Sequence, residues 1–332
     1  MKLLFAHRKQ RGYGNFSIEN YFQTLSYYFE KHASVQQWEP PYYSNGIFPR
    51  LWSIRTLRKF VRKQSPDLTH ITGDTHFLIW GISGGKRVLT IHDLGFLREV
   101  RGLKYYLLRF FWLTGPVRKA HAVTCVSYAT KKEIQRHFPG AGRIHVIPTV
   151  VDPRFVRHDK PFQTQRPVIL LLGSAQNKNL KRVLKATQGL EVRLSIVAKL
   201  DDEELGLLQG QVYDSCVSIS FEELLNLYRA ADIVALCSTH EGFGMPIIEA
   251  QVTGRVVITS DCSSMPEVAG KGALLVDPFS IESIHEGIKR VCSDESLRQK
   301  LITAGFENCK RFDSGKVANQ YLELYRRLLH IK

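Results

Sequence analysis

The 332-residue sequence lacks any apolar run approaching the ~20 residues that a membrane-spanning helix requires. The apolar stretch at its start is also much shorter than the core of a signal peptide. Its six cysteines are widely spaced, form no C-x-x-C pair and often lie in apolar, strand-like segments, which indicates small buried side chains rather than a disulfide framework or metal site. There are no short repeats or low-complexity tracts. We therefore expect a cytoplasmic globular protein of about two domains.

Acidic residues are scarce in the first half of the chain. Residues 1–160 hold 26 Lys and Arg but 10 Asp and Glu, a net charge of +16. Residues 161–332 hold 20 Lys and Arg and 21 Asp and Glu. The formal charge of +15 therefore belongs to one half. Such a half would suit a nucleic acid, an anionic membrane or an acidic substrate.

Strand-like and helix-like segments alternate along the chain. This order predicts an α/β fold in which helices cover parallel, doubly wound sheets. The proline-containing, polar segment 148–167 predicts a linker, so we place a domain boundary near residue 160. Strands are predicted at 2–6, 68–71, 87–91, 122–126 and 143–147, and then at 167–173, 192–197, 233–237, 255–259 and 273–276. Helices are predicted at 179–188, 221–231 and 314–329.

Two carboxylates eight positions apart flank a double-glycine turn after the strand predicted at 233–237. Pro246 fits the first turn of a following helix, where its missing N–H removes no hydrogen bond. Free backbone N–H groups and the positive end of the helix dipole favour an anion such as a diphosphate. The segment reads Glu241-Gly242-Phe243-Gly244-Met245-Pro246-Ile247-Ile248-Glu249.

This segment resembles the E-x7-E signature of the retaining glycosyltransferases of family 4 (glycosyl transferases group 1), which have the GT-B fold. The resemblance implies two Rossmann-like domains facing a central cleft: residues 1–160 on the acceptor side, residues 161–312 binding the nucleotide sugar, and a last helix, 313–332, crossing back to the first domain. It also implies that Glu249 binds the ribose, while Glu241 and the turn amides of Phe243, Gly244 and Met245 hold the donor sugar and phosphate. Gly242 and Gly244 would let the backbone approach the ligand closely.

Other segments extend the resemblance. The loop after the strand at 167–173, starting at Gly173, resembles the family's diphosphate loop, in which Lys178 fits the expected lysine. The arginine expected there is absent, since Ser174, Ala175 and Asn177 occupy its positions. Because this arginine is absent, a binding-only relative is an alternative. Lys181 or Arg182 could also replace the arginine.

Two motifs in the first half also resemble the family. Gly12-Tyr13-Gly14-Asn15 looks like its glycine loop, and Gly14 would then lie near the donor phosphate. His92, in an H-D segment at a strand end, would contact the donor sugar. Ser127 is predicted to cap a helix.

A serine-rich segment, Ser260–Val268, resembles the family's S-S-x-P-E-V sequence. It would shape the donor pocket, and Ser264 with Glu267 also has the spacing of a capping box.

The resulting interpretation is a retaining glycosyltransferase that moves a sugar from a nucleotide-diphosphate donor to a glycan or lipid-linked acceptor, in bacterial surface polysaccharide or lipopolysaccharide synthesis. His92, Lys178 and Glu241 are the predicted catalytic residues. No metal or other cofactor is expected, because no suitably placed D-x-D motif occurs. A GT-B sugar-nucleotide epimerase or phosphorylase and, remotely, a basic nucleic-acid-binding protein remain as alternatives, although nucleic acid is not an expected partner.

Two segments, 51–63 and 101–119, mix basic residues with aromatic and aliphatic ones. This pattern suits an interfacial helix on anionic lipid. For each segment alone, an amphipathic helix packed on a sheet is the slightly favoured interpretation. The basic first half favours a peripheral membrane surface on the cytoplasmic side.

Overall fold

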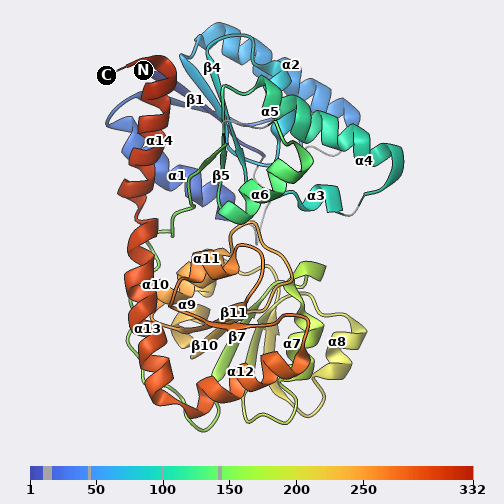
Figure 1. The fold of residues 1–332 in the computed structure, drawn as a ribbon, viewed down its shortest axis with the longest axis vertical. Helices are drawn as coiled ribbons and strands as arrows, with labels where there is room; N and C mark the ends of the chain where they lie inside the picture. Colours follow the sequence, from blue (N-terminus) through green and yellow to red (C-terminus); the bar gives the residue numbers. More distant parts are fainter. Residues whose placement is uncertain (10–16, 44–45, 99, 141–143, 332) are drawn as a thin grey trace. The chain divides into compact units, whose positions relative to one another are not determined.

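A computed structural model describes residues 1–9, 17–43, 46–98, 100–140 and 144–331. The described chain divides into two compact units. Unit 1 comprises residues 1–9, 17–150 and 314–331, and unit 2 comprises residues 151–313. The last helix of the chain therefore belongs to the same unit as the first strand (Figure 1).

Unit 1 contains a parallel sheet of six strands in the order β2-β1-β3-β4-β5-β6. Side chains alternate between its two faces, as the period of a β-strand requires. Leu3 and Phe5 of β1 pack with α1 and α14, while Leu4 and Ala6 pack on the opposite face with α2. The strands are β1 (Lys2–Ala6), β2 (Ser34–Trp38), β3 (Leu68–Ile71), β4 (Lys86–Ile91), β5 (Ala122–Cys125) and β6 (Ile144–Val146). The helices of eight or more residues are α1 (Ser17–Glu30), α2 (Ile47–Gln64), α6 (Tyr128–His137) and α14 (Ser314–Leu329).

Helix α14 is anchored in unit 1 by buried aromatic and polar contacts. Tyr321 and Tyr325 are fully buried. The Tyr21 hydroxyl donates to the Tyr321 oxygen over 2.9 Å. Between α14 and β4, His70 lies 2.7 Å from the Tyr325 hydroxyl and 2.7 Å from the Thr90 hydroxyl. Burial lowers the pKa of His70 well below its usual range, so the ring is neutral inside this network.

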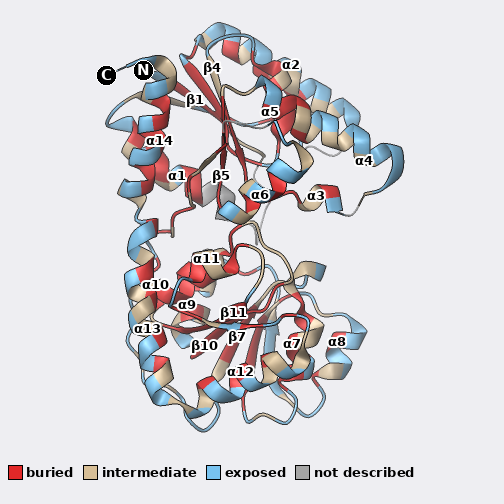
Figure 2. Cartoon of the chain, in the orientation of Figure 1, coloured by how far each residue is buried: buried red, intermediate tan, exposed pale blue. Residues whose placement is uncertain are grey.

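Unit 2 contains a second parallel sheet of six strands, in the order β12-β11-β10-β7-β8-β9. Counted from its own first strand this is the order 3-2-1-4-5-6 of dinucleotide-binding sheets. Its strands are mostly buried, like those of unit 1 (Figure 2). They are β7 (Val168–Leu172), β8 (Arg193–Val197), β9 (Val212–Cys216), β10 (Ile233–Leu236), β11 (Val256–Ser260) and β12 (Leu274–Val276). Its helices include α7 (Leu180–Ala186), α8 (Asp202–Leu207), α9 (Phe221–Ala230), α10 (Met245–Thr253), α11 (Met265–Ala269), α12 (Ile281–Ser293) and α13 (Glu295–Cys309).

The two parallel sheets confirm the predicted fold class. All ten predicted strands form, within about a residue at either end in the described segments, whereas β2 and β9 were not predicted. The six cysteines are free thiols. Among the described residues, no helix is both long and apolar enough to cross a membrane.

Candidate functional site

Three loops converge where neighbouring strands of unit 2 end. They follow β7, β10 and β11, which are adjacent in the sheet. The chain winds from β7 through β8 to β9 on one side and then returns to β10 on the other, so the strand order reverses between β7 and β10. Open parallel sheets bind ligands outside the carboxyl ends of strands at such a reversal. Topology alone therefore locates the candidate site at the loops 173–179 and 237–244.

Side chains of the loop after β7 hold the loop after β10 in place. The Asn177 amide donates to the His240 carbonyl over 2.9 Å, and the Thr239 N–H donates to the Asn177 carbonyl over 2.8 Å. The buried Asn179 amide donates to the Cys237 carbonyl over 3.0 Å. These bonds satisfy loop backbone groups that would otherwise be buried unpaired. The two loops thus form one connected platform.

Lys178 and Glu241, predicted from separate motifs, meet on this platform. Lys178 Nζ lies 2.8 Å from Glu241 Oε1, and both side chains are largely buried. Ser238 donates to the same carboxylate oxygen over 2.7 Å. Gly173 has φ of 87°, and a Cβ there would lie 3.3 Å from Lys178 Cγ. Gly173 therefore gives the Lys178 stem the room to lie across the end of β7.

The glycine turn leads into α10 as predicted, with proline in its first turn. Gly244 has φ of 101°, a left-handed conformation that favours glycine. Phe243 is buried, and its ring packs against the Phe312 ring at 5.5 Å between centroids. This contact anchors the turn in the core of unit 2. Gly242 and Met245, on either side, are half-buried. The turn presents backbone rather than bulky side chains at the sheet edge.

Two serines after β11 brace this turn. Ser263 Oγ donates to the Glu241 carbonyl over 2.8 Å, and Ser264 Oγ donates to the carbonyls of Glu241 and Phe243, each over 2.9 Å. Ser264 makes no side-chain capping bond to α11, so the capping box with Glu267, one of the two roles considered for this segment, is wrong. The Ser264 hydroxyl hydrogen is directed at the two turn carbonyls, so this side chain braces the turn and does not cap the helix.

Glu249 lies buried in α10, one turn beyond the start of the helix. Tyr228 of α9, itself fully buried, donates to Glu249 Oε2 over 2.5 Å. Burial raises the pKa of Glu249 to about 7, although the Tyr228 hydrogen bond and the Lys178 charge oppose this shift. The Phe155 ring meets the Tyr228 ring edge to face at 5.1 Å and fixes its direction. Among the described residues no donor to Oε1, the second carboxylate oxygen, is found, so it is available to a ligand.

The two cations proposed as replacements for the missing arginine have other partners. Lys181 lies 3.0 Å from Asp201 and 2.5 Å from Glu203, carboxylates at the start of α8, and these contacts raise its pKa. The Arg182 guanidinium lies 5.7 Å from the centre of the Phe279 ring. The structure therefore pairs Lys178, rather than these two, with the loop after β10.

In unit 1, His92 also follows a strand end, after β4. Its Nε2 lies 2.8 Å from the Thr72 carbonyl, which can only accept, so Nε2 carries the hydrogen and Nδ1 is an acceptor. Burial lowers the pKa of His92, and its ring meets Tyr21 edge to face at 6.3 Å. His7, after β1, bonds the Thr72 hydroxyl over 2.9 Å. Gly14 lies outside the described residues.

Tyr228 is one of the site residues that the sequence analysis missed, with Asn179 and Ser238. It was assigned to a helix, and α9 does form there with Ser220 as its cap. The position of Tyr228 in the sequence was a signal. It lies in the helix just before β10, and a tyrosine there can reach α10, the helix just after β10. Its partner, however, becomes visible only when α9 and α10 pack. Ser127 does cap α6, as predicted, by accepting from the Thr130 N–H.

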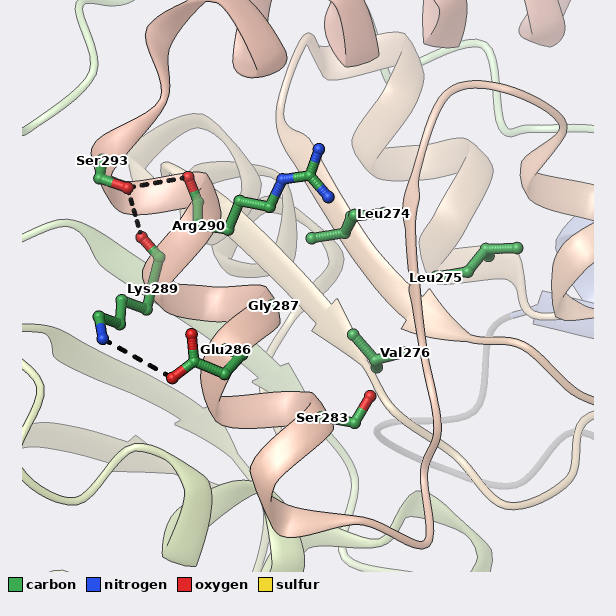
Figure 3. A pocket seen from close by; sticks show the side chains of 9 residues that line it. All are labelled: Leu274, Leu275, Val276, Ser283, Glu286, Gly287, Lys289, Arg290 and Ser293. Carbon is green, nitrogen blue, oxygen red and sulfur yellow. Dashed lines mark hydrogen bonds and ion pairs between the residues drawn. The ribbon is translucent and has the colours of Figure 1, made fainter.

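A pocket of about 430 Å³ lies elsewhere, between β12 and α12 (Figure 3). Leu274 and Val276 form its apolar wall. On its polar side, Lys289 pairs with Glu286 over 3.7 Å. None of the predicted site residues lines it. Its lysine is already paired, and none of the loops after β7, β10 and β11 lines it.

Comparison with known proteins agrees with the geometry. The fold matches sucrose-phosphate synthase of Thermosynechococcus elongatus (TM-score 0.80, 18% identity, 99% of this chain and 100% of that one) and Anabaena HepE solved with UDP and glucose (TM-score 0.77, 16% identity, 98% and 99%). These define the class of the fold as GT-B. Residues 22–155 match Glycosyltransferase Family 4, and residues 153–308 match Glycosyl transferases group 1. The chain belongs to this glycosyltransferase family.

Relatives in sequence carry related names. O-antigen chain mannosyltransferase B of Escherichia coli is 35% identical over 107 residues, which are 32% of this chain and 28% of that protein. MMP α-(1→4)-mannosyltransferase of Mycolicibacterium hassiacum is 24% identical over 229 residues, 64% of this chain and 55% of that protein. The chain thus spans about a quarter to a half of the length of these relatives.

Proposed function

We propose that this protein transfers a sugar from a nucleotide-diphosphate donor to a glycan or lipid-linked acceptor, with retention of anomeric configuration, in bacterial surface polysaccharide or lipopolysaccharide synthesis. One observation carries the proposal. Lys178 and Glu241, from separate motifs, meet 2.8 Å apart at the strand-order reversal of unit 2. Family membership and the mannosyltransferase names of two relatives support the reaction class.

The donor would bind by its nucleotide and diphosphate to unit 2. Glu249 Oε1 would accept from the ribose hydroxyls, while Tyr228 keeps hold of Oε2. The diphosphate would lie at the start of α10, where the helix dipole favours negative charge. The amides of the 242–245 turn and the Lys178 ammonium would bind its oxygens, with Gly173 leaving space for the lysine stem.

The chemistry follows from where charge develops. As the bond from the sugar to the diphosphate breaks, negative charge grows on the departing oxygen and positive charge on the sugar ring. Lys178 and the N-terminus of α10 would stabilise the negative charge on the departing oxygen. Both groups are fixed in position before the reaction. The Glu241 carboxylate would lie beside the positive charge on the sugar ring. His92 of unit 1 would offer the donor sugar a neutral nitrogen as a hydrogen-bond acceptor. The nucleotide sugar is the co-substrate, and the proposal includes no metal.

A second candidate is a binding-only relative. The arginine position is unfilled, and Lys181 is paired with Asp201 and Glu203. With less cationic charge at the diphosphate, the leaving group would be stabilised less. Such a protein would bind a nucleotide sugar without transferring the sugar.

Thermal unfolding with UDP, GDP, ADP and their sugars tests donor binding. A ligand at ~100 times its dissociation constant should add about 2.7 kcal/mol to the unit that binds it. We expect one nucleotide to stabilise the wild type and to lose this effect in Glu249→Ala. Failure of every nucleotide to stabilise the protein would refute the donor site.

Product analysis with the stabilising sugar nucleotide separates the remaining possibilities. Release of free nucleotide and a glycosylated acceptor supports transfer, and proton NMR of the anomeric centre reports retention or inversion. Binding without turnover would favour the binding-only relative. An inverted product would refute retention while leaving the donor site intact.

A further inference from the structure

Two helical segments of unit 1 expose an unusual set of large apolar side chains. They are α2 and the continuous helical stretch 102–119, which comprises α4 (Gly102–Leu108), the π-helical turn η2 (Arg109–Thr114) and α5 (Gly115–Lys119). Phe48 is 85% exposed and Leu103 is 75% exposed. We call the outward surface of residues 47–64 and 101–119 the basic–aromatic face. Its exposed apolar residues are Ile47, Phe48, Leu51, Trp52, Leu103, Tyr106, Leu107, Phe110 and Phe111.

Every charged residue in these two segments is basic. Residues 47–64 contain six Lys and Arg, residues 101–119 contain five, and neither contains Asp or Glu. A solvated helix surface normally mixes both signs, because opposite charges four positions apart stabilise the helix. Eleven cations with no acid among them instead create a field that attracts an anionic surface.

The two segments adjoin in space. The Arg50 guanidinium lies 4.5 Å from the centre of the Trp112 ring, which joins the first turn of α2 to η2. Trp80 fills the space between them: Arg58 donates to its carbonyl over 2.9 Å, and its ring stacks with Phe110 at 6.2 Å. Lys119 lies over the same indole at 4.8 Å. The two segments therefore form one face (Figure 1).

Helical phase puts apolar and basic residues on one stripe of α2. Phe48, Trp52, Arg55, Lys59 and Arg62 follow at three- and four-residue steps and are all exposed, while Leu57 and Val61 are buried beneath. The stripe is apolar in its first half and basic in its second. An interfacial helix places such apolar side chains among acyl chains while the cations lie at the headgroups.

The π-helical turn adds to this arrangement. Phe110 and Phe111, consecutive residues, are both about half exposed, while Leu113 is fully buried. A π turn holds more residues than an α turn and shifts the phase of the side chains. Both aromatic rings can therefore face outward without removing Leu113 from the core.

We propose that the basic–aromatic face docks unit 1 on an anionic lipid bilayer. A second copy of the chain is a poor occupant, because it would bring eleven further cations against these eleven. A nucleic acid matches the charge, but the exposed leucines and isoleucine would gain nothing from phosphates or bases. An anionic bilayer offers both a negative surface and an apolar layer beneath it.

This inference is independent of the proposed transferase activity. Docking needs neither the donor site nor any residue of unit 2. It is therefore measured without a nucleotide, and loss of donor binding would leave it untouched.

Vesicle sedimentation of the full chain tests the proposal. We expect co-sedimentation with vesicles of phosphatidylcholine and phosphatidylglycerol, and at least tenfold weaker partitioning into phosphatidylcholine alone. The variant Arg55→Gln, Lys59→Gln, Arg62→Gln should lose at least tenfold in partitioning, since each cation near an anionic surface contributes about fivefold. Glutamine is a good helix former and these side chains are exposed, so α2 should stay folded.

A matched control removes the same charge from unit 2. Lys185→Gln, Lys271→Gln, Lys300→Gln changes three exposed lysines outside the face and should leave partitioning within about twofold. Equal loss in this control would overturn the proposal, because the attraction would then come from net charge and not from a face. Thermal unfolding of each variant verifies that it is folded.

The apolar contribution has its own variant. Phe48→Gln, Leu51→Gln, Leu103→Gln, Leu107→Gln should abolish the partitioning that persists at high salt, where charge is screened. Leu205→Gln with Val217→Gln, two exposed positions of unit 2, is the control. No preference for anionic vesicles would overturn the proposal. So would concentration-dependent dimerisation removed by the apolar variant, or face-dependent binding of single-stranded RNA with none to vesicles.

Discussion

The two units share one architecture and differ in what they place at the sheet edge and on the surface. Each has six parallel strands whose order reverses beside its first strand. In unit 2 the loops there hold Lys178 and Glu241, whereas the described loops of unit 1 hold His7 and His92 around Thr72. The excess positive charge of unit 1 lies largely on helices such as α2. The sheet thus fixes where a site can form, and the loops decide its chemistry.

Burial shifts the pKa of a carboxyl in unit 2 and of a histidine in unit 1 in opposite directions. It raises the pKa of Glu249 to about 7 and lowers the pKa of His92. Both shifts favour the neutral form, because burial penalises charge. Glu249 has the nearby Lys178 charge to draw it back towards ionisation, which makes the unit 2 site responsive to pH near neutrality.

The largest predicted effect compares two lysines of unit 2 that lie three residues apart. Lys178→Ala should lower kcat/KM for transfer by about 10²–10³, the usual loss when one group stabilising a developing charge is removed. Lys181→Ala should change it by no more than a few fold, since Lys181 forms exposed ion pairs with Asp201 and Glu203. Steady-state kinetics of the two variants measures both values of kcat/KM. Equal losses would mean that Lys181 leaves its partners to bind the diphosphate.

A second prediction compares two glycines with left-handed backbone. Gly173 has φ of 87° and Gly189 has φ of 77°, so alanine at either should cost about 1 kcal/mol of unfolding free energy. A Cβ at Gly173 would press on Lys178, whereas nothing lies within 4 Å of one at Gly189. Gly173→Ala alone should therefore weaken nucleotide-sugar binding, by about tenfold. Urea unfolding and calorimetric titration measure the two effects, and equal affinities would show that Lys178 does not touch the donor.

The smallest effect tests the Tyr228–Glu249 contact. Ionised Glu249 accepts ribose hydroxyls better than the acid does, so nucleotide-sugar affinity should rise a few fold as pH rises through about 7. Tyr228→Phe removes a hydrogen bond that lowers the pKa, so the midpoint should move to higher pH. Titrations between pH 6 and 8 measure it, with Glu249→Gln expected to be independent of pH. An unmoved midpoint in Tyr228→Phe would contradict the assignment.

The same raised pKa has a consequence for stability. A carboxyl whose folded pKa exceeds its unfolded value stabilises the fold below the unfolded pKa, and this contribution is lost as pH rises through the folded one. Without ligand, unit 2 should therefore become less stable as pH rises through about 7. The Glu249→Gln variant should lack this slope in thermal unfolding.

Much of the fold could be predicted because buried parallel strands are continuous apolar runs. The exceptions, β2 and β9, are each the outermost strand of their sheet. Residues of β9 are mostly exposed, and its sequence Val-Tyr-Asp-Ser-Cys carries polar residues where a central strand would not. An edge strand forms because its neighbour offers hydrogen bonds, and that neighbour lies elsewhere in the sequence.

Site residues could be predicted where a chemically suitable residue stands at the spacing of a motif. They could not be predicted where their contacts depend on how helices pack. Glu241, Lys178 and Glu249 stood out by their motifs. The hydroxyl of Ser264 did not, since a capping box and a brace for the glycine turn require the same residue. Tyr228 was assigned only to a helix, because its contact with Glu249 depends on how α9 and α10 pack.

Helix α14 has a consequence for the order in which the protein can fold. Unit 1 is built from the beginning of the chain and from its last helix, with unit 2 lying between them in sequence. On the ribosome, unit 2 is synthesised completely before Tyr321 and Tyr325 exist to fill the core beside α1. Until then the surface that α14 covers stays open to solvent. A stop codon just before residue 314 would leave the described residues of unit 2 in the chain and yet remove from unit 1, the part made first, the helix that completes its core.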